Sequence, residues 1–355
     1  MNINDIARLA NVSKATVSRA LNHRKDVSEE TRERILRIVN EVGYSRNFVA
    51  RGLATKRLQS IGLVIPRSAR FIFGNPYFSE LIQGIGEVVD VRGYHLVLST
   101  SPDKSVYLRL FSEKRVDGLI LLGSGIRESD FEKINSMLGH DFPVVLINRR
   151  SRKFRCPAVT VDDTDGVFQA IGHLYELGHR SIATIAGPPE SIHGGERLEA
   201  YRRALEDYGL AVDERLVVLS DDTENGGYKA AKELSSRGVE FTAIFAANDL
   251  MALGAMGYFQ DSGMRIPDDV SIVGFDDIHL ASLVRPSLTT IKQSIREVGE
   301  TAARLLLDIL ERKDGTLRAG EVKLPTELKV RQSSGPPRKV VAVKDMQGGL
   351  GVWME

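Results

Sequence analysis

The sequence predicts a small all-α head followed by a larger α/β domain of two similar lobes. In residues 1–60 the apolar spacings are helical, whereas from Ile61 onward short apolar runs alternate with helical stretches. This alternation occurs in two successive series, which predicts two parallel-sheet lobes rather than one continuous sheet. At 355 residues the chain is also too long for one typical domain.

The composition is that of a globular protein and excludes several other classes. Apolar residues make up 42% and charged residues 27% of the chain, which are ordinary values. No run of about eighteen apolar residues is present to span a membrane, and the N-terminal MNINDIARLA lacks the basic and apolar regions of a secretory signal. Cys156 is the only cysteine, which excludes an intrachain disulfide and a cysteine metal site. We therefore expect a cytoplasmic protein.

The charge is unevenly distributed along the chain. Residues 1–60 contain twelve Lys and Arg but six Asp and Glu, a net charge of +6, so the rest of the chain carries −5 of the overall +1. A basic head on a mildly acidic body suggests that the head binds a polyanion. On charge alone, a solvated basic surface is equally consistent.

Three short helices are expected in the head, each preceded by a side chain that can cap it. Asn2 can cap the first helix, and Ser13 can cap a second helix from Lys14 to about Asn22. Ser28, followed by two glutamates in the first turn, opens a third helix that ends near Gly43.

The second of these helices has an apolar inward face and a polar outward face. Val17, Ala20 and Leu21 are spaced at i, i+3 and i+4 and therefore face inward. The outward face comprises Lys14, Ala15, Ser18, Arg19 and Asn22. In a major groove, Arg19 can donate two hydrogen bonds to a guanine edge, and Ala15 can contact a thymine methyl. Two short helices joined by a tight turn in a basic segment favour a helix-turn-helix over a small basic bundle.

The segments INDIARLANVSKATVSRALN and VSEETRERILRIVNEVGYSRNFVARGL closely resemble the DNA-binding head of the lactose/galactose repressor (LacI/GalR) family of bacterial transcriptional regulators. The similarity extends almost without gaps from Ile3 to Leu63. It implies that Lys14, Ala15 and Arg19 contact bases. It further implies that the DNA backbone is held mostly by Asn4, Ser13, Thr16, Ser18 and Asn22.

Residues 47–58 are expected to form a hinge between the head (1–46) and the body. An isolated helix of one or two turns is marginal in water, and Gly52 weakens it further. In the family that the segment resembles, it folds on DNA, pairs with its dimer mate and inserts a leucine into the minor groove, and Leu53 matches that leucine. The hinge residues expected to contact DNA are Asn47, Ala50, Arg51 and Leu53. A flexible linker is the alternative.

The body contains two series of apolar runs that read as buried parallel strands. The first series comprises residues 61–65, 95–98, 118–122, 144–147 and 159–161, and the second comprises 182–185, 217–219, 243–245 and 271–273. Ligands of such folds bind at the carboxyl ends of the strands, so the cleft between the lobes is the expected site.

The body also resembles this family, through VDGLILL, AIGHLYELGHRSIATIAGPP and IPDDVSIVGFDD. The resemblance implies a two-lobed, periplasmic-binding-protein-like (type I) sensor domain over residues 59–335. Its topology implies that the helix Ile295–Arg312 returns to the first lobe. The expected limits are 59–161 and 292–320 for lobe 1, 162–291 and 321–332 for lobe 2, and 336–355 for a flexible tail. The tail lacks the leucine heptads of the tetrameric branch, so we expect a homodimer.

Polar side chains follow several predicted strands and can build a ligand pocket. Asp162, Asn248 and Asp276 stand at strand ends, and Arg197 opens a helix after a Gly-Gly turn. Amide, carboxylate and guanidinium groups suit ligands rich in hydroxyls. With those implied by the resemblance, the expected effector-binding residues are Tyr77, Phe78, Asn148, Arg149, Asp162, His193, Arg197, Asp222, Asn248 and Asp276. Four further acids are expected to be cap or loop residues: Asp163, Asp249, Asp268 and Asp277.

These features predict a transcriptional regulator, most simply a repressor of a carbohydrate-utilisation operon that binds a palindromic operator. A transport-type sugar-binding protein would need a signal peptide and no basic head. An enzyme is not expected, because phosphate-loop, HExxH and nucleophile-elbow motifs are absent, and no metal or cofactor is expected. A mono- or oligosaccharide is the favoured effector. A nucleobase or nucleoside is the next, and the segment ARGLATKR leaves a phosphoprotein corepressor open. Whether the ligand releases or strengthens DNA binding stays open.

Overall fold

The computed structural model describes most of the chain and divides it into two compact units, residues 1–58 and 59–355. The described residues are 2–21, 26–43, 57–101, 103, 109–110, 112–113, 115–123, 126, 130–132, 136, 142–151, 156–188, 191–312 and 320–338. Within these ranges no helix combines the length and the apolar character needed to cross a membrane.

The N-terminal unit contains the three predicted helices: α1 (Ile3–Leu9), α2 (Lys14–Leu21) and α3 (Glu29–Glu41). The Asn2 side chain and Asp5 form a reciprocal capping box on α1. Ser13 Oγ accepts the Thr16 amide at 3.0 Å, and Ser28 caps α3. A small core fixes the three helices against one another; its buried members are Ile6, Ala7, Ala10, Val17, Ala20, Leu21, Val27 and Ile35.

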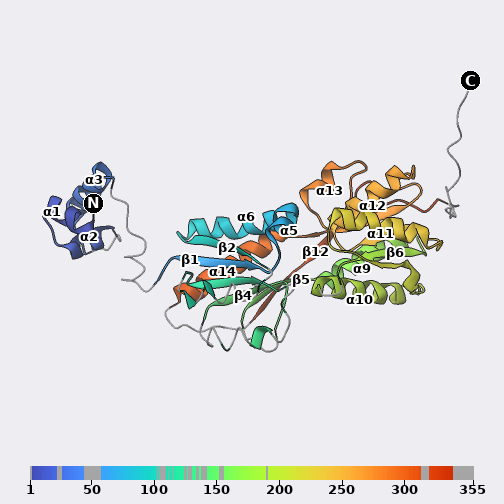
Figure 1. Ribbon diagram of the computed structural model, residues 1–355, viewed down its shortest axis with the longest axis horizontal. Helices are drawn as coiled ribbons and strands as arrows, with labels where there is room; N and C mark the ends of the chain where they lie inside the picture. Colours follow the sequence, from blue (N-terminus) through green and yellow to red (C-terminus); the bar gives the residue numbers. More distant parts are fainter. Residues whose placement is uncertain are drawn as a thin grey trace, which may run out of the picture. The chain divides into compact units, whose positions relative to one another are not determined.

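The second unit consists of two six-stranded sheets with the same arrangement of strands (Figure 1). The first sheet has the order β11-β5-β4-β3-β1-β2 and is parallel throughout. Its strands are β1 (Ser60–Ile65), β2 (His95–Thr100), β3 (Gly118–Leu122), β4 (Val144–Ile147), β5 (Ala158–Val161) and β11 (Glu321–Leu324). The second has the order β12-β10-β9-β8-β6-β7, and β12 is antiparallel to β10. Its strands are β6 (Ile182–Ala186), β7 (Val217–Leu219), β8 (Ala243–Ala246), β9 (Ser271–Asp276), β10 (Thr289–Gln293) and β12 (Thr326–Lys329).

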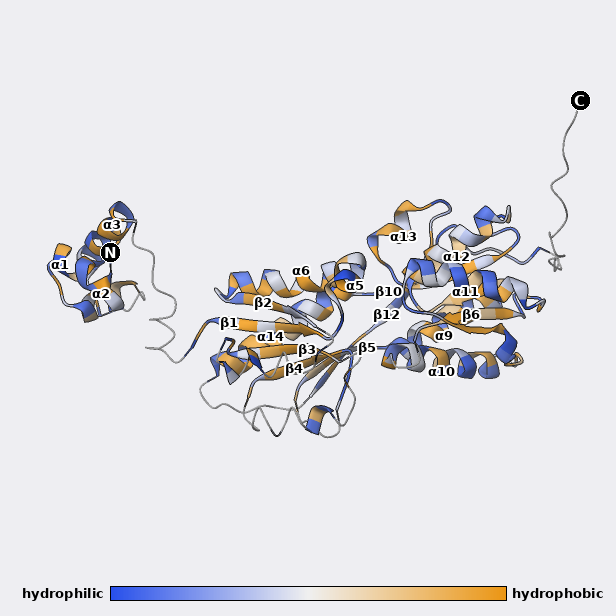
Figure 2. Cartoon of the chain, viewed as in Figure 1, coloured by the Kyte–Doolittle hydropathy of each residue, from blue (hydrophilic) through white to orange (hydrophobic). Residues whose placement is uncertain are grey.

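Helices cover both faces of the second sheet, which explains its continuous apolar strands. In β8, Ala243 and Phe245 pack towards α9 (Asp163–Glu176) and α10 (Ile192–Asp207). The alternate residues Ile244 and Ala246 pack towards α11 (Glu224–Ser236) and α12 (Asp249–Asp261). Figure 2 shows the apolar residues gathered in the strands and on the inner sides of these helices. Such double burial is the pattern that the sequence predicted.

The other described helices belong to one lobe each. In the first lobe, α6 (Pro76–Val91) and α14 (Ile295–Glu311) lie on one face of the sheet, and α5 (Ala69–Gly74) precedes α6. In the second lobe, α13 (His279–Leu283) follows β9, and a 3₁₀ turn (Glu214–Leu216) precedes β7.

The chain passes between the lobes three times, and one predicted limit is wrong. The helix α14 packs in the first lobe, as predicted. However, residues 321–324 do not belong to the second lobe, because β11 pairs with β5 of the first sheet. Pro325 has no amide hydrogen and separates β11 from β12, so the two short strands join different sheets. β10 also extends to Gln293, which places the second passage slightly later than 292.

The end of the described chain lies against the second lobe. Gly335 O accepts hydrogen bonds from Ser271 Oγ at 3.0 Å, and Arg338 pairs with Asp268 at 3.0 Å. The rest of the expected flexible tail, residues 339–355, lies outside the described residues.

Candidate functional site

The outward face of α2 is exposed, as its spacing predicted. Lys14, Ala15 and Arg19 are exposed, whereas Val17 and Ala20 are buried. Among the other residues expected to contact DNA, Asn4 and Ser13 are exposed, and Thr16 and Ser18 are half-buried. Asn22, Asn47, Ala50, Arg51 and Leu53 lie outside the described residues.

Arg19 is held by contacts that a DNA base can replace. Its Nη1 lies 3.1 Å from Asp26 Oδ2, and its Nε donates to the carbonyl oxygen of Ala15 at 3.3 Å. Both side chains of the ion pair are about half exposed, and exposed pairs contribute only about 0–1 kcal/mol. Arg19 can therefore leave Asp26 for a guanine edge at little cost.

A cavity of about 90 Å³ lies between the two lobes. One buried water needs roughly 10–15 Å³, so the cavity has room for several waters and can admit a small-molecule ligand. The first lobe lines it with Arg67, Phe71, Asn75, Tyr77, Phe78, Leu122 and Asn148. The second lobe lines it with Ser191, His193, Gly194, Arg197, Asp222, Ala247, Asn248, Asp276 and Gln293. Half of these residues stand at or just beyond the carboxyl ends of strands, and the others belong to α5, α6, α10 or the residues that cap them.

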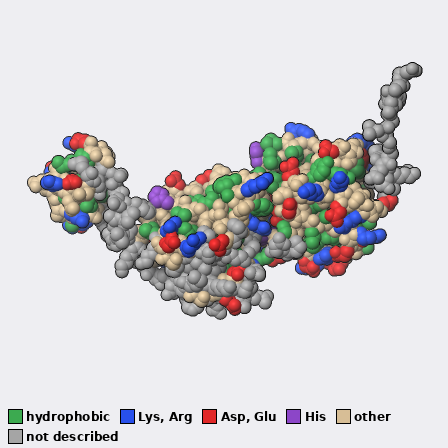
Figure 3. Space-filling model, in the orientation of Figure 1, with side chains coloured by type: hydrophobic (Ala, Val, Ile, Leu, Met, Phe, Trp, Pro, Cys, Tyr) green, Lys and Arg blue, Asp and Glu red, His purple; other side chains and the backbone are tan. Residues whose placement is uncertain are grey.

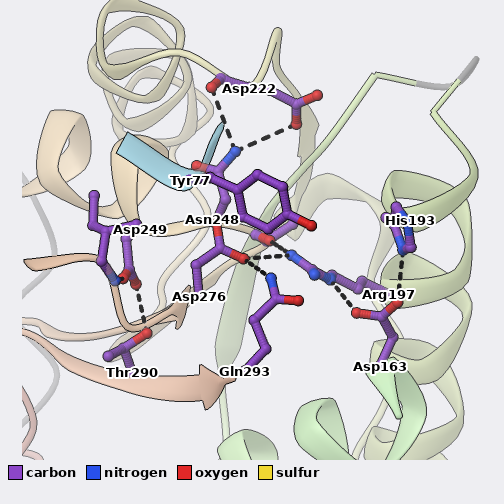
Figure 4. Close-up of polar contacts among 12 residues, drawn as sticks. Tyr77, Asp163, His193, Arg197, Asp222, Asn248, Asp249, Asp276, Thr290 and Gln293 are labelled. Atoms are coloured by element: carbon purple, nitrogen blue, oxygen red, sulfur yellow. Dashed lines mark hydrogen bonds and ion pairs between the residues drawn. The ribbon is translucent and has the colours of Figure 1, made fainter. Parts of the chain in front are cut away.

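Arg197 is the central charged group of the cavity (Figure 4). It is 7% exposed, and its guanidinium lies 3.7 Å from the ring centroid of Phe275. Nε donates to Asp163 Oδ1 at 2.8 Å, and Nη1 donates to the Ala247 carbonyl oxygen at 2.5 Å and approaches Asp276 Oδ1 at 3.5 Å. A buried charge is tolerated when it is paired and hydrogen-bonded in this way.

Asp163, expected to be a loop or cap residue, is instead the buried partner of Arg197. It also accepts a hydrogen bond from His193 Nδ1 at 2.7 Å. Burial raises the pKa of its carboxyl, but the charges of Arg197 and His193 outweigh burial and hold that pKa well below the usual range. Asp162, expected in the pocket, caps α9 and pairs with Lys323 at 2.6 Å.

Two buried polar atoms in the cavity have no partner among the described residues. They are Asn148 Oδ1 and His193 Nε2. Asn148 Nδ2 donates to the Tyr77 hydroxyl at 2.6 Å, and burial raises the pKa of Tyr77, so that hydroxyl stays neutral. Buried polar groups are rarely left unpaired, so these two atoms can bond to a ligand or a water in the cavity.

Asn248 and Asp222 belong to the wall of the cavity that the second lobe provides. Asn248 Oδ1 caps α12 by accepting the Met251 amide at 2.7 Å, and its Nδ2 approaches Asp222 Oδ1 at 3.4 Å. Asp222 has a left-handed backbone, with φ of 65°. Burial raises the pKa of the Asp222 carboxyl, and the charge of Arg67 lowers it in part.

Asp276 and Asp249 are two further buried carboxyls behind Arg197. Burial raises the pKa of Asp276 to about 7, although the Arg197 charge opposes the change. Asp249 was expected to cap α12, but Asn248 is the cap. Asp249 is fully buried, accepts the Ile278 amide at 2.9 Å and the Thr290 hydroxyl at 2.5 Å, and has a pKa raised by burial.

The other two acids expected in loops or caps also form ion pairs: Asp268 pairs with Arg338 at the surface, and Asp277 forms a half-buried pair with Arg331. Arg149 was expected in the pocket but is not among the residues that line the cavity. Its Nη1 donates to the Ile126 carbonyl oxygen, and its guanidinium lies 5.1 Å from the Phe131 ring centroid. Asn148, which directly follows β4, has a left-handed backbone with φ of 59°.

Sequence reasoning did not find Arg67, Phe71, Asn75, Ser191 and Gln293, which also line the cavity. Gln293 is the last residue of β10, so a search for polar residues at strand ends could have found it. Arg67, Phe71 and Asn75 flank or belong to the short helix α5, which the apolar spacing did not reveal. Among the described residues, Asp163, His193 and Glu196 bring ligand-type atoms within 4.8 Å of one another. However, the Asp163 carboxylate is already paired with Arg197, and the positive charge of Arg197 disfavours a metal ion beside it.

The cavity alternates hydrogen-bond donors, acceptors and aromatic rings. Its two arginines, Arg67 and Arg197, are balanced by the carboxyls of Asp222 and Asp276. Figure 3 shows charges of both signs interspersed over the visible face of the two-lobed unit, without a continuous basic surface. The two-lobed unit is therefore suited to a neutral, polar small molecule, and the exposed base-contacting candidates lie on α2.

Comparison with known proteins gives matches along nearly the whole chain. The family described as "Bacterial regulatory proteins, lacI family" matches residues 2–47, and a "Periplasmic binding protein-like domain" matches residues 171–334. Catabolite control protein A of Priestia megaterium is 35% identical over 337 residues, which cover 94% of this chain and 98% of that protein.

Two solved structures have the same architecture. A complex of the transcriptional regulator CelR with cellobiose is 34% identical, with a TM-score of 0.72 over 94% of this chain and 100% of that one. A lac repressor dimer bound to operator and the anti-inducer ONPF is 29% identical, with a TM-score of 0.83 over 94% of this chain and 99% of that one.

Proposed function

We propose that this chain, which belongs to the lacI family of bacterial regulatory proteins, is a repressor of a carbohydrate-utilisation operon whose effector is a sugar. The observation that carries the effector class is the cavity between the lobes. There a buried arginine fork, carboxylates and two unpartnered polar atoms face one another. Such interleaved donors and acceptors match adjacent hydroxyls. The CelR relative bound to cellobiose supports the same class.

A nucleobase or nucleoside is the second candidate effector. It is favoured by three aromatic rings on one wall of the cavity, those of Phe71, Tyr77 and Phe78. These rings meet one another edge to face, however, and do not form two parallel walls around a flat ligand. The charged groups of the other wall favour a sugar.

The head would bind a palindromic operator as part of a homodimer. One head reaches few base pairs, so two heads related by a two-fold axis are needed for specificity. The hinge around Leu53, whose residues lie outside the described ranges, would wedge into the minor groove between the half-sites. Because DNA is the proposed partner, we place the protein in the bacterial cytoplasm, on the nucleoid when bound.

The effector would act on DNA through the packing between the lobes. Ile278, which follows β9 in the second lobe, is buried against the core of the first. The Glu80 carboxylate on α6 accepts the backbone N–H of His279 at the start of α13. A ligand that draws the lobes together or apart changes these contacts, and with them the relative positions of the two hinges in a dimer.

Arg19→Ala tests DNA reading. Loss of a bidentate contact should reduce discrimination at one base pair of each half-site by about 1–3 kcal/mol. The measurement is selection of binding sites from a random DNA pool with full-length protein, followed by affinities for single-base variants. Arg8→Ala is the matched control, because Arg8 is an exposed arginine on α1. Unchanged selectivity in Arg19→Ala would show that Arg19 does not read a base.

A further inference from the structure

In the first lobe, the short helix α5 lies beside the cavity. The corresponding connection in the second lobe is much shorter. Because the two sheets share one strand order, the β1–α6 connection corresponds to the β6–α10 connection. The first spans residues 66–75 and includes α5, whereas the second spans only residues 187–191. Figure 1 shows α5 at the end of the first lobe that faces the second.

This connection brings an arginine and an aromatic ring to the outer part of the cavity. The Arg67 guanidinium lies 5.2 Å from the centroid of the Phe71 ring. Phe71 meets Phe78 at 5.8 Å, and Phe78 meets Tyr77 at 5.4 Å, both edge to face. Tyr77 and Phe78 are buried, but Phe71 and Arg67 are only half-buried, so this aromatic series leads from the inside of the cavity outwards.

The outer arrangement repeats the chemistry of the inner one. Inside, Arg197 stacks on Phe275 and faces Asp276. Outside, Arg67 stacks on Phe71, and its charge acts on Asp222 across the cavity. The backbone amide of Arg67 donates to the Ile65 carbonyl oxygen, but its side chain forms no hydrogen bond or ion pair with another described residue. The five N–H donors of its guanidinium are therefore available to a ligand.

We propose that the effector is a neutral disaccharide or longer glycoside, whose inner ring lies at Arg197 and Asp276 and whose outer ring lies between Arg67 and Asp222 on Phe71. The inference rests on the sugar effector proposed above. Each station offers a donor fork and a carboxylate to adjacent hydroxyls, and Phe71, which lines the cavity, adds an aromatic surface at the outer station. Because a carboxyl balances each arginine, neither station carries the net positive charge that would favour a sugar phosphate over a neutral sugar.

Calorimetric titration of the full-length protein tests this inference. The probes are glucose against cellobiose and maltose, galactose against lactose, and xylose against xylobiose. One disaccharide should bind at least about tenfold tighter than its own monosaccharide, as expected for hydrogen bonds to a charged group. Arg67→Ala should reduce that ratio by about tenfold. Arg70→Ala, which removes an exposed arginine of α5 outside the cavity, should preserve it.

A second pair of variants tests the aromatic platform. Phe71→Ala should reduce the same ratio, whereas Phe73→Ala, which removes a 69% exposed ring of the same helix, should not. Phe71 also packs against the first-lobe core, so the melting temperature of each variant is recorded without sugar. If Phe71→Ala does not fold, the comparison of Arg67→Ala with Arg70→Ala decides whether the outer ring is bound.

The outcomes separate this inference from the function on which it rests. If a monosaccharide binds as tightly as every disaccharide that contains it, or if Arg67→Ala keeps the wild-type ratio, the two-ring effector is wrong and the sugar-controlled regulator stands. If none of these sugars binds, the sugar effector itself is wrong, and the two-ring proposal falls with it.

Discussion

Full-length protein carrying Arg197→Ala is expected to lose its response to effector and to unfold at a much lower temperature than the wild type. Arg197 compensates the buried carboxylate of Asp163 and approaches Asp276. Removing one partner of a buried ion pair typically costs about 3–5 kcal/mol, because the other charge stays buried and unpaired. Calorimetric titration and thermal unfolding measure the two effects.

Arg197→Lys separates binding from stability. Lysine keeps the positive charge near Asp163 but lacks the planar fork that donates in several directions. This variant should recover part of the lost melting temperature and still bind sugar at least about a hundredfold more weakly. Since the head is a separate compact unit, both variants should still bind operator DNA. Wild-type sugar affinity in Arg197→Lys would contradict the central place given to the guanidinium.

Asp276→Asn is expected to weaken effector binding while making the protein more stable at pH 8. The Asp276 carboxyl lies 7% exposed, and burial raises its pKa to about 7. At pH 8 the wild type therefore holds an ionised carboxylate in a buried place, whereas the amide is neutral and of similar shape. Loss of a charged hydrogen-bond acceptor should reduce sugar affinity roughly tenfold to a hundredfold.

The stability of the wild type should depend on pH through the ionisation of Asp276. Between about pH 4 and 7 the folded wild type holds the Asp276 proton more tightly than the unfolded chain, so its free energy of unfolding falls as pH rises through this range. The Asp276→Asn side chain does not ionise, so the free energy of unfolding of this variant should exceed that of the wild type by an amount that grows from pH 5 to pH 8. Unfolding in denaturant at several pH values measures it, with the exposed Asp207→Asn as control. An equal effect at pH 5 and pH 8 would show that ionisation of Asp276 is not the cause.

Strand spacing and helix capping predicted the helical head and the two α/β lobes, whereas the return of α14 to the first lobe was implied by the family resemblance. The head follows from side chains that cap their own helices, such as Asn2 and Ser28, and the sheets follow from apolar runs buried on both faces. The assignment of β11 failed because a four-residue strand with three exposed residues has no apolar pattern. Its partner is decided by the free edge of β5 and by Pro325.

The pocket was predictable at strand ends but not at the level of single side chains. In Asp162-Asp163 two identical side chains are adjacent, and only the helix start decides which one turns inward towards Arg197. Of the adjacent Asn148 and Arg149, only Asn148 lines the cavity. The part of the cavity built by α5 was not predicted, because a six-residue helix is too short to show an apolar periodicity.

The most direct test of ligand-controlled DNA binding is the affinity of the full-length protein for its selected operator, with and without saturating sugar. The operator is the sequence enriched from the random pool, and the sugar is the one bound most tightly in the calorimetric panel. We predict a palindromic operator whose affinity changes with sugar, and a sugar affinity that changes by the same factor when operator is bound. No enriched sequence, or an operator affinity that is identical with and without sugar, would contradict it.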